Sequence, residues 1–147
     1  MRAAHRYLTQ DRQVPQGRLL YVGESLGAAV VTELATEHPP AGLLLRSPFV
    51  DLAAAGRAHY PSYLPVGALL RDRYPVAEQL ARIAVVYGTE DGIVPPEQSR
   101  AVARAVGGPS LLVAVRGADH NDRALLDGTV LVRAVTELAD RATTGQT

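Results

Sequence analysis

The sequence predicts an α/β fold, a three-layer domain in which helices cover both faces of a parallel sheet of about four strands. Four short apolar runs are separated from one another by sequence of helical character, which is typical of βαβ units. Each run is continuously apolar and does not alternate with polar residues, as expected for parallel strands that are covered on both faces. The runs occupy residues 19–22, 41–45, 83–87 and 111–115.

The composition predicts one globular domain over residues 1–147. Hydrophobic residues make up 47% and charged residues 20% of the chain, and the formal net charge is zero. A net charge of zero does not indicate a nucleic-acid or anionic membrane partner. All 15 basic residues are arginine and there is no cysteine, which excludes lysine mechanisms, disulfides and thiolate sites. No stretch resembles a signal peptide or a membrane span, so we expect a cytoplasmic protein.

The first elements follow from helical stripes and turn residues. Apolar positions 3, 4, 7 and 8 share one helical face, and residues 14–17 turn the chain into the strand at 19–22. A second helix is predicted from Leu26 to about His38, where two prolines stop it.

In the second half of the chain, some segments give clear secondary-structure patterns and others give weak ones. Residues 50–82 give weak patterns, with helices over 51–59 and 76–82 and a proline-punctuated loop between them. A helix that buries Val102 and Val106 follows the third run and closes at Gly107-Gly108. The last helix is interrupted near Asp127-Gly128, and residues 143–147 are predicted to fray.

The segment Gly23-Glu24-Ser25-Leu26-Gly27 joins the first strand to its helix. Strand, Gly-x-Ser-x-Gly and helix form the arrangement of a nucleophile elbow, whose serine sits on a strained turn. We expect both flanking glycines to be required, because a side chain there would collide with the neighbouring strand or helix. The alternative is an ordinary turn in which Ser25 caps the helix.

Three chemically active residues follow three of the predicted strands. Ser25 follows the first run, Asp91 the third and His120 the fourth, so all three are predicted at the carboxyl edge of the sheet. A serine hydroxyl needs a base within hydrogen-bond reach to act as a nucleophile. Histidine can take and return that proton near neutral pH, and a buried carboxylate fixes its tautomer.

These motifs resemble the alpha/beta-hydrolase superfamily. The matching segments are Val22–Val30, Leu45–Phe49, Tyr87–Pro95 and Gly117–Asp122, and the resemblance covers nearly the whole chain. It implies a serine hydrolase in which Ser25 is the nucleophile, Asp91 the acid and His120 the base. The resemblance also implies that the Leu26 N–H contributes to the oxyanion hole. The implied reaction requires no cofactor or metal.

Each assignment has an alternative. Glu90 is the immediate rival of Asp91, Asp51 follows the second run where some hydrolases place the acid, and Asp119 is interpreted as a loop or helix-capping residue. His5 and His38 are expected to be solvated, whereas His59 lies in the weakly patterned region and is a candidate to line a pocket.

The family pattern also contains parts without a counterpart here. The first four strands of the family's sheet are missing, and with them the loop that supplies the second oxyanion donor. The chain therefore resembles the C-terminal half of a hydrolase, as from a truncated gene. We expect it to cleave a small carboxylic ester or related acyl bond, weakly in this form, with residues 60–63 and 69–70 shaping an acyl pocket. The alternative function is a non-catalytic remnant that serves as an assembly module.

The missing strands predict an exposed sheet edge. Without its family partner, the apolar strand 19–22 becomes an edge strand with no proline or charge to protect it. The expected partners are thus a small acyl substrate and, through this edge, a second copy of the chain.

Overall fold

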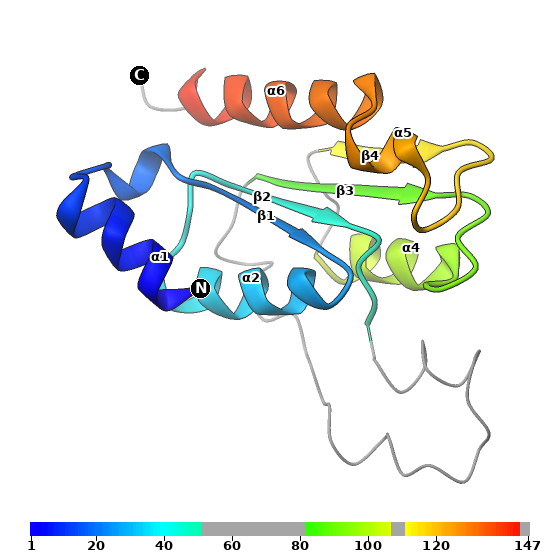
Figure 1. Ribbon diagram of the computed structural model, residues 1–147, viewed down its shortest axis with the longest axis horizontal. Helices are drawn as coiled ribbons and strands as arrows, with labels where there is room; N and C mark the ends of the chain where they lie inside the picture. The colour runs from blue at the N-terminus through cyan, green and yellow to red at the C-terminus, as the bar shows by residue number, and fades with distance from the viewer. Residues whose placement is uncertain (51–81, 107–110, 145–147) are drawn as a thin grey trace, which may run out of the picture.

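The computed structural model describes residues 1–50, 82–106 and 111–144. Their core is one parallel sheet of four strands in the order β1-β2-β3-β4 (Figure 1). The strands are β1 (Leu20–Glu24), β2 (Gly42–Arg46), β3 (Ile83–Gly88) and β4 (Leu111–Val115). The predicted fold class is confirmed, and each apolar run forms a strand.

Several predictions concern residues outside the described ranges. They are the helices at 51–59 and 76–82, the pocket around 60–63 and 69–70, the closing glycines 107–108 and the end of the tail. Asp51 and His59 belong to the same group.

Helices cover both faces of the sheet. On one face lie α2 (Leu26–Glu37) and α4 (Pro96–Ala105), and on the other lie α5 (Arg123–Leu126) and α6 (Thr129–Thr144). The break between α5 and α6 falls at Asp127-Gly128, as predicted. The first face is packed through residues such as Val31, Leu45 and Val85, and the second through Leu44, Val86 and Leu138. No helix in the described part of the chain is long and apolar enough to cross a membrane.

The two middle strands differ from the two outer ones in burial. Every residue of β2 and β3 is buried, as the continuous apolar runs predicted. In the outer strands one face is open, since Val22 of β1 is 51% exposed and Leu112 of β4 is 50% exposed. Within the described residues β1 pairs only with β2, so the predicted edge position of this strand is confirmed.

The predicted N-terminal helix is present, and its apolar stripe is open to solvent. The helix α1 (Arg2–Arg6) continues as a wider π-helical turn over Tyr7–Asp11, but the stripe at positions 3, 4, 7 and 8 is exposed. Tyr7 is 51% and Leu8 38% exposed. A helical stripe identifies which face is apolar, but the pattern does not show that another element covers that face.

The expectation that His5 and His38 are solvated is wrong. Both side chains are half-buried, and their rings stack with centroids 4.2 Å apart. His5 Nε2 lies 2.7 Å from Gln16 Oε1, and the Gln16 amide donates to the Tyr21 hydroxyl at 3.2 Å. It also donates to the His38 carbonyl at 3.0 Å. This cluster attaches the N-terminal helix to the sheet at the amino-terminal ends of the strands. Ser25 lies at the opposite, carboxyl-terminal ends.

Candidate active site

Ser25 occupies a strained position at the end of β1. Its backbone angles are φ 50° and ψ −117°, a conformation that L-residues rarely adopt. The Ser25 N–H donates to the Arg46 carbonyl at 2.9 Å, which ties the turn to the end of the neighbouring strand β2. The chain reverses directly into α2, so the half-buried serine lies at the carboxyl edge of the sheet.

The two glycines of the elbow have different surroundings. A Cβ at Gly23 would overlap Val31 Cγ2 and would lie 2.6 Å from the Gly27 carbonyl oxygen, so only glycine fits there. The collision expected at Gly27 is absent, since no atom lies within 4 Å of a Cβ at this position. The expectation for Gly27 is therefore wrong: close approach of strand and helix requires the first glycine but not the second.

Leu26 is the first residue of α2. The first N–H groups of a helix have no acceptor within the helix and carry its partial positive charge. The Leu26 N–H directly follows Ser25 in the chain and belongs to this first turn.

Asp91 and His120 form a buried pair. His120 Nδ1 lies 2.8 Å from Asp91 Oδ2, and the exposed fractions of the two side chains are 6% and 1%. The other carboxylate oxygen, Oδ1, accepts the N–H groups of Ile93 at 3.0 Å and Val94 at 2.7 Å. These three bonds fix the carboxylate in the orientation that holds the imidazole. By contrast, the rival Glu90 is exposed.

The loops that carry the pair are held together by Asp119. Its Oδ1 accepts the Gly92 N–H at 2.9 Å and the His120 N–H at 2.7 Å. The Gly92 bond, followed by the His120 bond, lowers the pKa of the Asp119 carboxyl. Asp119 is thus a loop residue, one of the two roles expected for it. Its bonds join the loop that carries Asp91 (residues 89–95, the acid loop) to the loop that carries His120 (residues 116–122, the base loop).

A backbone contact also brings these loops together. A Cβ at Gly88, the last residue of β3, would overlap the Ala118 carbonyl oxygen. The same carbonyl accepts the Glu90 N–H at 3.1 Å. Gly88 therefore allows the loop after β4 to approach the end of β3 closely, just before the loop that carries Asp91.

Sequence reasoning missed Arg46, a buried cation at the same edge. Arg46 ends β2, pairs with Glu24 through Nη2 and Oε1, and donates from Nη1 to the His120 carbonyl at 2.8 Å. Burial lowers the pKa of its guanidinium, and the Asp91 charge opposes that effect. The sequence signals were a charged residue that ends an apolar run and the position of Arg46 within the matching segment Leu45–Phe49, and neither indicated its contacts.

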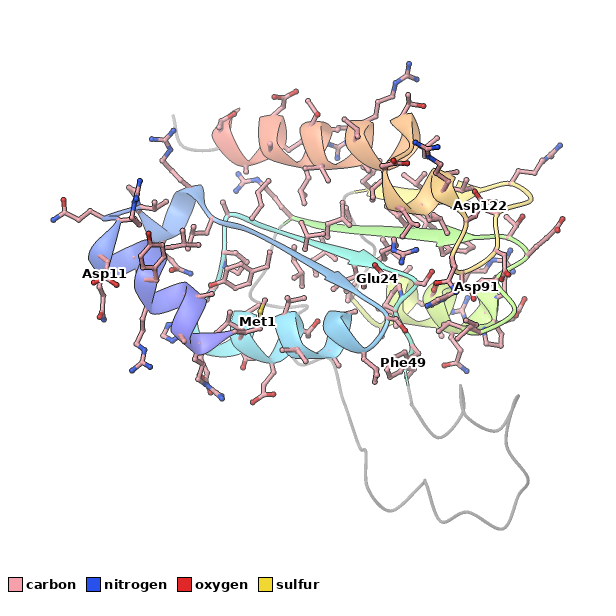
Figure 2. The ribbon with its side chains drawn as sticks, in the orientation of Figure 1. Met1, Asp11, Glu24, Phe49, Asp91 and Asp122 are labelled. Carbon is pink, nitrogen blue, oxygen red and sulfur yellow. The ribbon has the colours of Figure 1, made fainter. Side chains whose placement is uncertain are left out.

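The predicted site residues gather at one edge of the sheet. Glu24 and Asp91 both lie at the end toward which the strand arrows point (Figure 2). Arg46 contacts both sides of the site, because its carbonyl accepts from Ser25 and its guanidinium donates to His120. The structure shows the hydrogen bond between Asp91 and His120, whereas the described contacts include none from the Ser25 hydroxyl to His120. Among the described residues, no group of three His, Asp or Glu side chains could hold a metal ion.

Comparison with known sequences gives relatives of about twice this length. No family model matches the chain. Two proteins of Mycobacterium tuberculosis, the uncharacterized proteins MT2364 and Rv2307c, are each 44% identical over 150 residues. The match covers 99% of this chain and 53% of each relative, so the chain spans about half the length of the relatives.

Solved structures with a similar fold are hydrolases. An esterase domain from Rhodothermus marinus matches with a TM-score of 0.66 and 22% identity, over 95% of this chain and 66% of that one. A puromycin-hydrolyzing peptidase of M. tuberculosis has a TM-score of 0.71 and 22% identity, over 96% and 24%. An alpha-beta hydrolase from Vibrio vulnificus has a TM-score of 0.63 and 17% identity, over 95% and 54%. The chain has a partial alpha/beta-hydrolase fold.

Proposed function

We propose that this chain is a serine hydrolase that cleaves a carboxylic ester or related acyl bond. The observation that carries the proposal is the buried pair of Asp91 and His120, 2.8 Å apart at the sheet edge where the strained Ser25 lies. A carboxylate held by two backbone N–H groups and aimed at a histidine ring is what a general base requires.

In the proposed reaction the Ser25 oxygen attacks the acyl carbonyl carbon while His120 Nε2 takes the hydroxyl proton. Asp91 holds Nδ1 and stabilises the imidazolium that forms. The tetrahedral intermediate collapses when His120 gives the proton to the leaving alkoxide, which leaves an acyl group on Ser25. Water, deprotonated by the same histidine, then attacks the acyl carbonyl. His120 returns that proton to Ser25 Oγ as the bond between Oγ and the acyl carbon breaks, which releases the acid and free Ser25.

The oxyanion of each intermediate requires hydrogen-bond donors. The Leu26 N–H at the start of α2 supplies one, and the described residues provide no loop equivalent to the second donor of the family pattern. Loss of one such donor typically slows kcat by about 10²–10³-fold. We therefore propose slow turnover for residues 1–147, which makes a covalent probe a better test than steady-state hydrolysis.

The test is the reaction of the chain with a fluorophosphonate, located by mass spectrometry of peptides. We expect one phosphonyl group on Ser25, slower labelling in His120→Ala and Asp91→Asn, and none in Ser25→Ala. The matched control is Ser47→Ala, since Ser47 is fully buried next to the site and its hydroxyl has no hydrogen-bond partner. This variant should label at the wild-type rate.

The labelling also separates the proposal from its alternative. A folded wild-type chain whose Ser25 does not react would contradict the serine-hydrolase function. That result would favour a non-catalytic module that associates through the open edge of β1.

A further inference from the structure

Arg46 carries a charge in a place where charges are costly. The residue is 2% exposed and lies at the end of β2, one of the two middle strands. Arginine keeps its proton in proteins, so the side chain is a buried cation that needs partners. Its position between buried strands suggests a role for the charge itself, because apolar residues of similar size usually pack at least as stably as a buried ion pair.

The partners of Arg46 belong to three different parts of the candidate site. Nη2 pairs with Glu24, the residue before Ser25, whose side chain is 48% exposed. Nη1 donates to the His120 carbonyl at 2.8 Å, and the Asp91 carboxylate interacts with the guanidinium through its charge. The Arg46 carbonyl accepts the Ser25 N–H at 2.9 Å. One residue thus contacts the elbow and the base loop and faces the acid.

These contacts have consequences for alignment. Ser25 is carried by β1 and His120 by the loop after β4, so the two are separated by the full width of the described sheet in strand order. The planar guanidinium reaches two partners in fixed directions: Nη1 donates a hydrogen bond to the His120 carbonyl, and Nη2 makes an ion pair, without a hydrogen bond, with the Glu24 carboxylate. It therefore sets the distance between the two, to which nucleophile activation is sensitive.

We propose that the Glu24–Arg46 pair is a positioning unit that aligns the His120 loop with the Ser25 elbow. The proposal rests on the proposed function, since alignment matters only if Ser25 and His120 react together. Glu24 fixes the guanidinium, and the guanidinium holds the backbone of the base. Lysine cannot replace it fully, because a single ammonium group lacks the planar fork that spans both partners.

The test compares five proteins by their rate of Ser25 phosphonylation over a range of pH. They are the wild type, Arg46→Lys, Arg46→Met, the double variant Glu24→Gln/Arg46→Met, and the control Arg2→Met. The double variant leaves neither charge unpaired, so it keeps the test valid if Arg46→Met fails to fold. Arg2 forms exposed ion pairs with Glu33 and Glu37, so its variant reports the effect of losing an arginine outside the site.

We expect Arg46→Met and the double variant to label about 10- to 100-fold more slowly, as for a small misplacement of reacting groups. Arg46→Lys should recover part of the rate, and Arg2→Met all of it. The charged groups near His120 are Asp91, Asp119 and the Glu24–Arg46 pair. Loss of the cation alone makes the imidazolium easier to form, so the pH midpoint of labelling in Arg46→Met should move upward.

Two outcomes would overturn the inference while leaving the proposed function intact. One is a folded double variant that labels at the wild-type rate. The other is a rate that falls only in proportion to the unfolded fraction. If even the wild type does not label, amide hydrogen exchange decides: the inference then requires faster exchange at Ser25 and His120 in the double variant, and wild-type exchange there contradicts it.

Discussion

Asp119 is an exposed side chain that connects the loop carrying Asp91 to the loop carrying His120. Its carboxylate accepts the Gly92 N–H of the acid loop and the His120 N–H of the base loop. These bonds lower the pKa of its carboxyl, so the ionised form is favoured by folding. The Asp91–His120 geometry therefore depends on a residue that does not belong to the pair.

For this single residue we predict that Asp119→Ala loosens the loop that carries Asp91 and the loop that carries His120. Amide exchange at Gly92 and His120 should become faster, and Asn at position 119 should give an intermediate effect because its oxygen is a weaker acceptor. Asp11→Ala, at the opposite end of the sheet (Figure 2), is the control and should leave both amides unchanged. Unchanged exchange in Asp119→Ala would contradict the bridging role.

Asp119 also contributes to the pH dependence of folding stability in acid. Its folded-state pKa is lowered, so the folded chain binds fewer protons than the unfolded chain below the ordinary value of about 3.9. The stabilisation is present above that value and is lost as the pH falls through the lowered folded-state pKa. In acid titrations followed by circular dichroism, Asp119→Ala should lose stability less steeply below about pH 4 than the wild type.

Residue patterns predicted the participants in the site but not the contacts between them. Ser25, Asp91 and His120 are recognisable because each is a chemically suitable residue placed just after a strand. Arg46 was missed because the partner of a buried charge is set by tertiary packing, and no spacing in the sequence encodes that Glu24 reaches it. The exposure of His5 and His38 was misjudged for the same reason. Their rings stack between α1 and the C-terminal end of α2, and this contact is set by tertiary packing.

At the scale of elements, the tight join between β1 and α2 depends on one glycine of the elbow. We predict that Gly23→Ala destabilises the fold by about 1–3 kcal/mol, since the added methyl overlaps Val31 and crowds backbone atoms of α2. It should also abolish labelling of Ser25. Gly27→Ala is the matched control, because that site is open and alanine suits a helix better by about 0.5–1 kcal/mol. Urea unfolding of both variants measures the difference, and equal stability would contradict the packing described here.

Strands were easier to predict than the environment of helices. The four apolar runs became four strands because a strand buried on both faces requires such a run. The periodic stripe that includes Tyr7 and Leu8 correctly predicted helical structure, yet both side chains are exposed in the described chain. Periodicity reports the shape of an element, whereas burial depends on which other elements are present.

At the scale of the whole molecule, the open edge of β1 decides how the chain behaves in solution. This strand pairs on one side only within the described residues, and Val22 on its face is 51% exposed. Unpaired backbone groups beside an apolar surface favour pairing with another chain. We therefore expect marginal stability, with dimerisation through β1 or aggregation.

Size-exclusion chromatography with light scattering tests this expectation. Val22→Lys should shift the chain toward a monomer, because a charge on an edge strand opposes association. Val132→Lys is the matched control, since Val132 is 56% exposed but lies on the helix α6 and not on an edge strand. A wild-type chain that remains a monomer at high concentration would show that the β1 edge is covered.

The most direct test of the account is a crystal structure of the fluorophosphonate adduct, which locates nucleophile, base and oxyanion donor together. We predict phosphorus bonded to Ser25 Oγ and a phosphonyl oxygen about 2.7–3.1 Å from the Leu26 nitrogen. His120 Nε2 should lie within hydrogen-bond reach of Ser25 Oγ, with Asp91 still bonded to Nδ1. An adduct on another residue, or a His120 ring more than about 5 Å from Ser25 Oγ, well beyond the reach of a working base, would contradict the account.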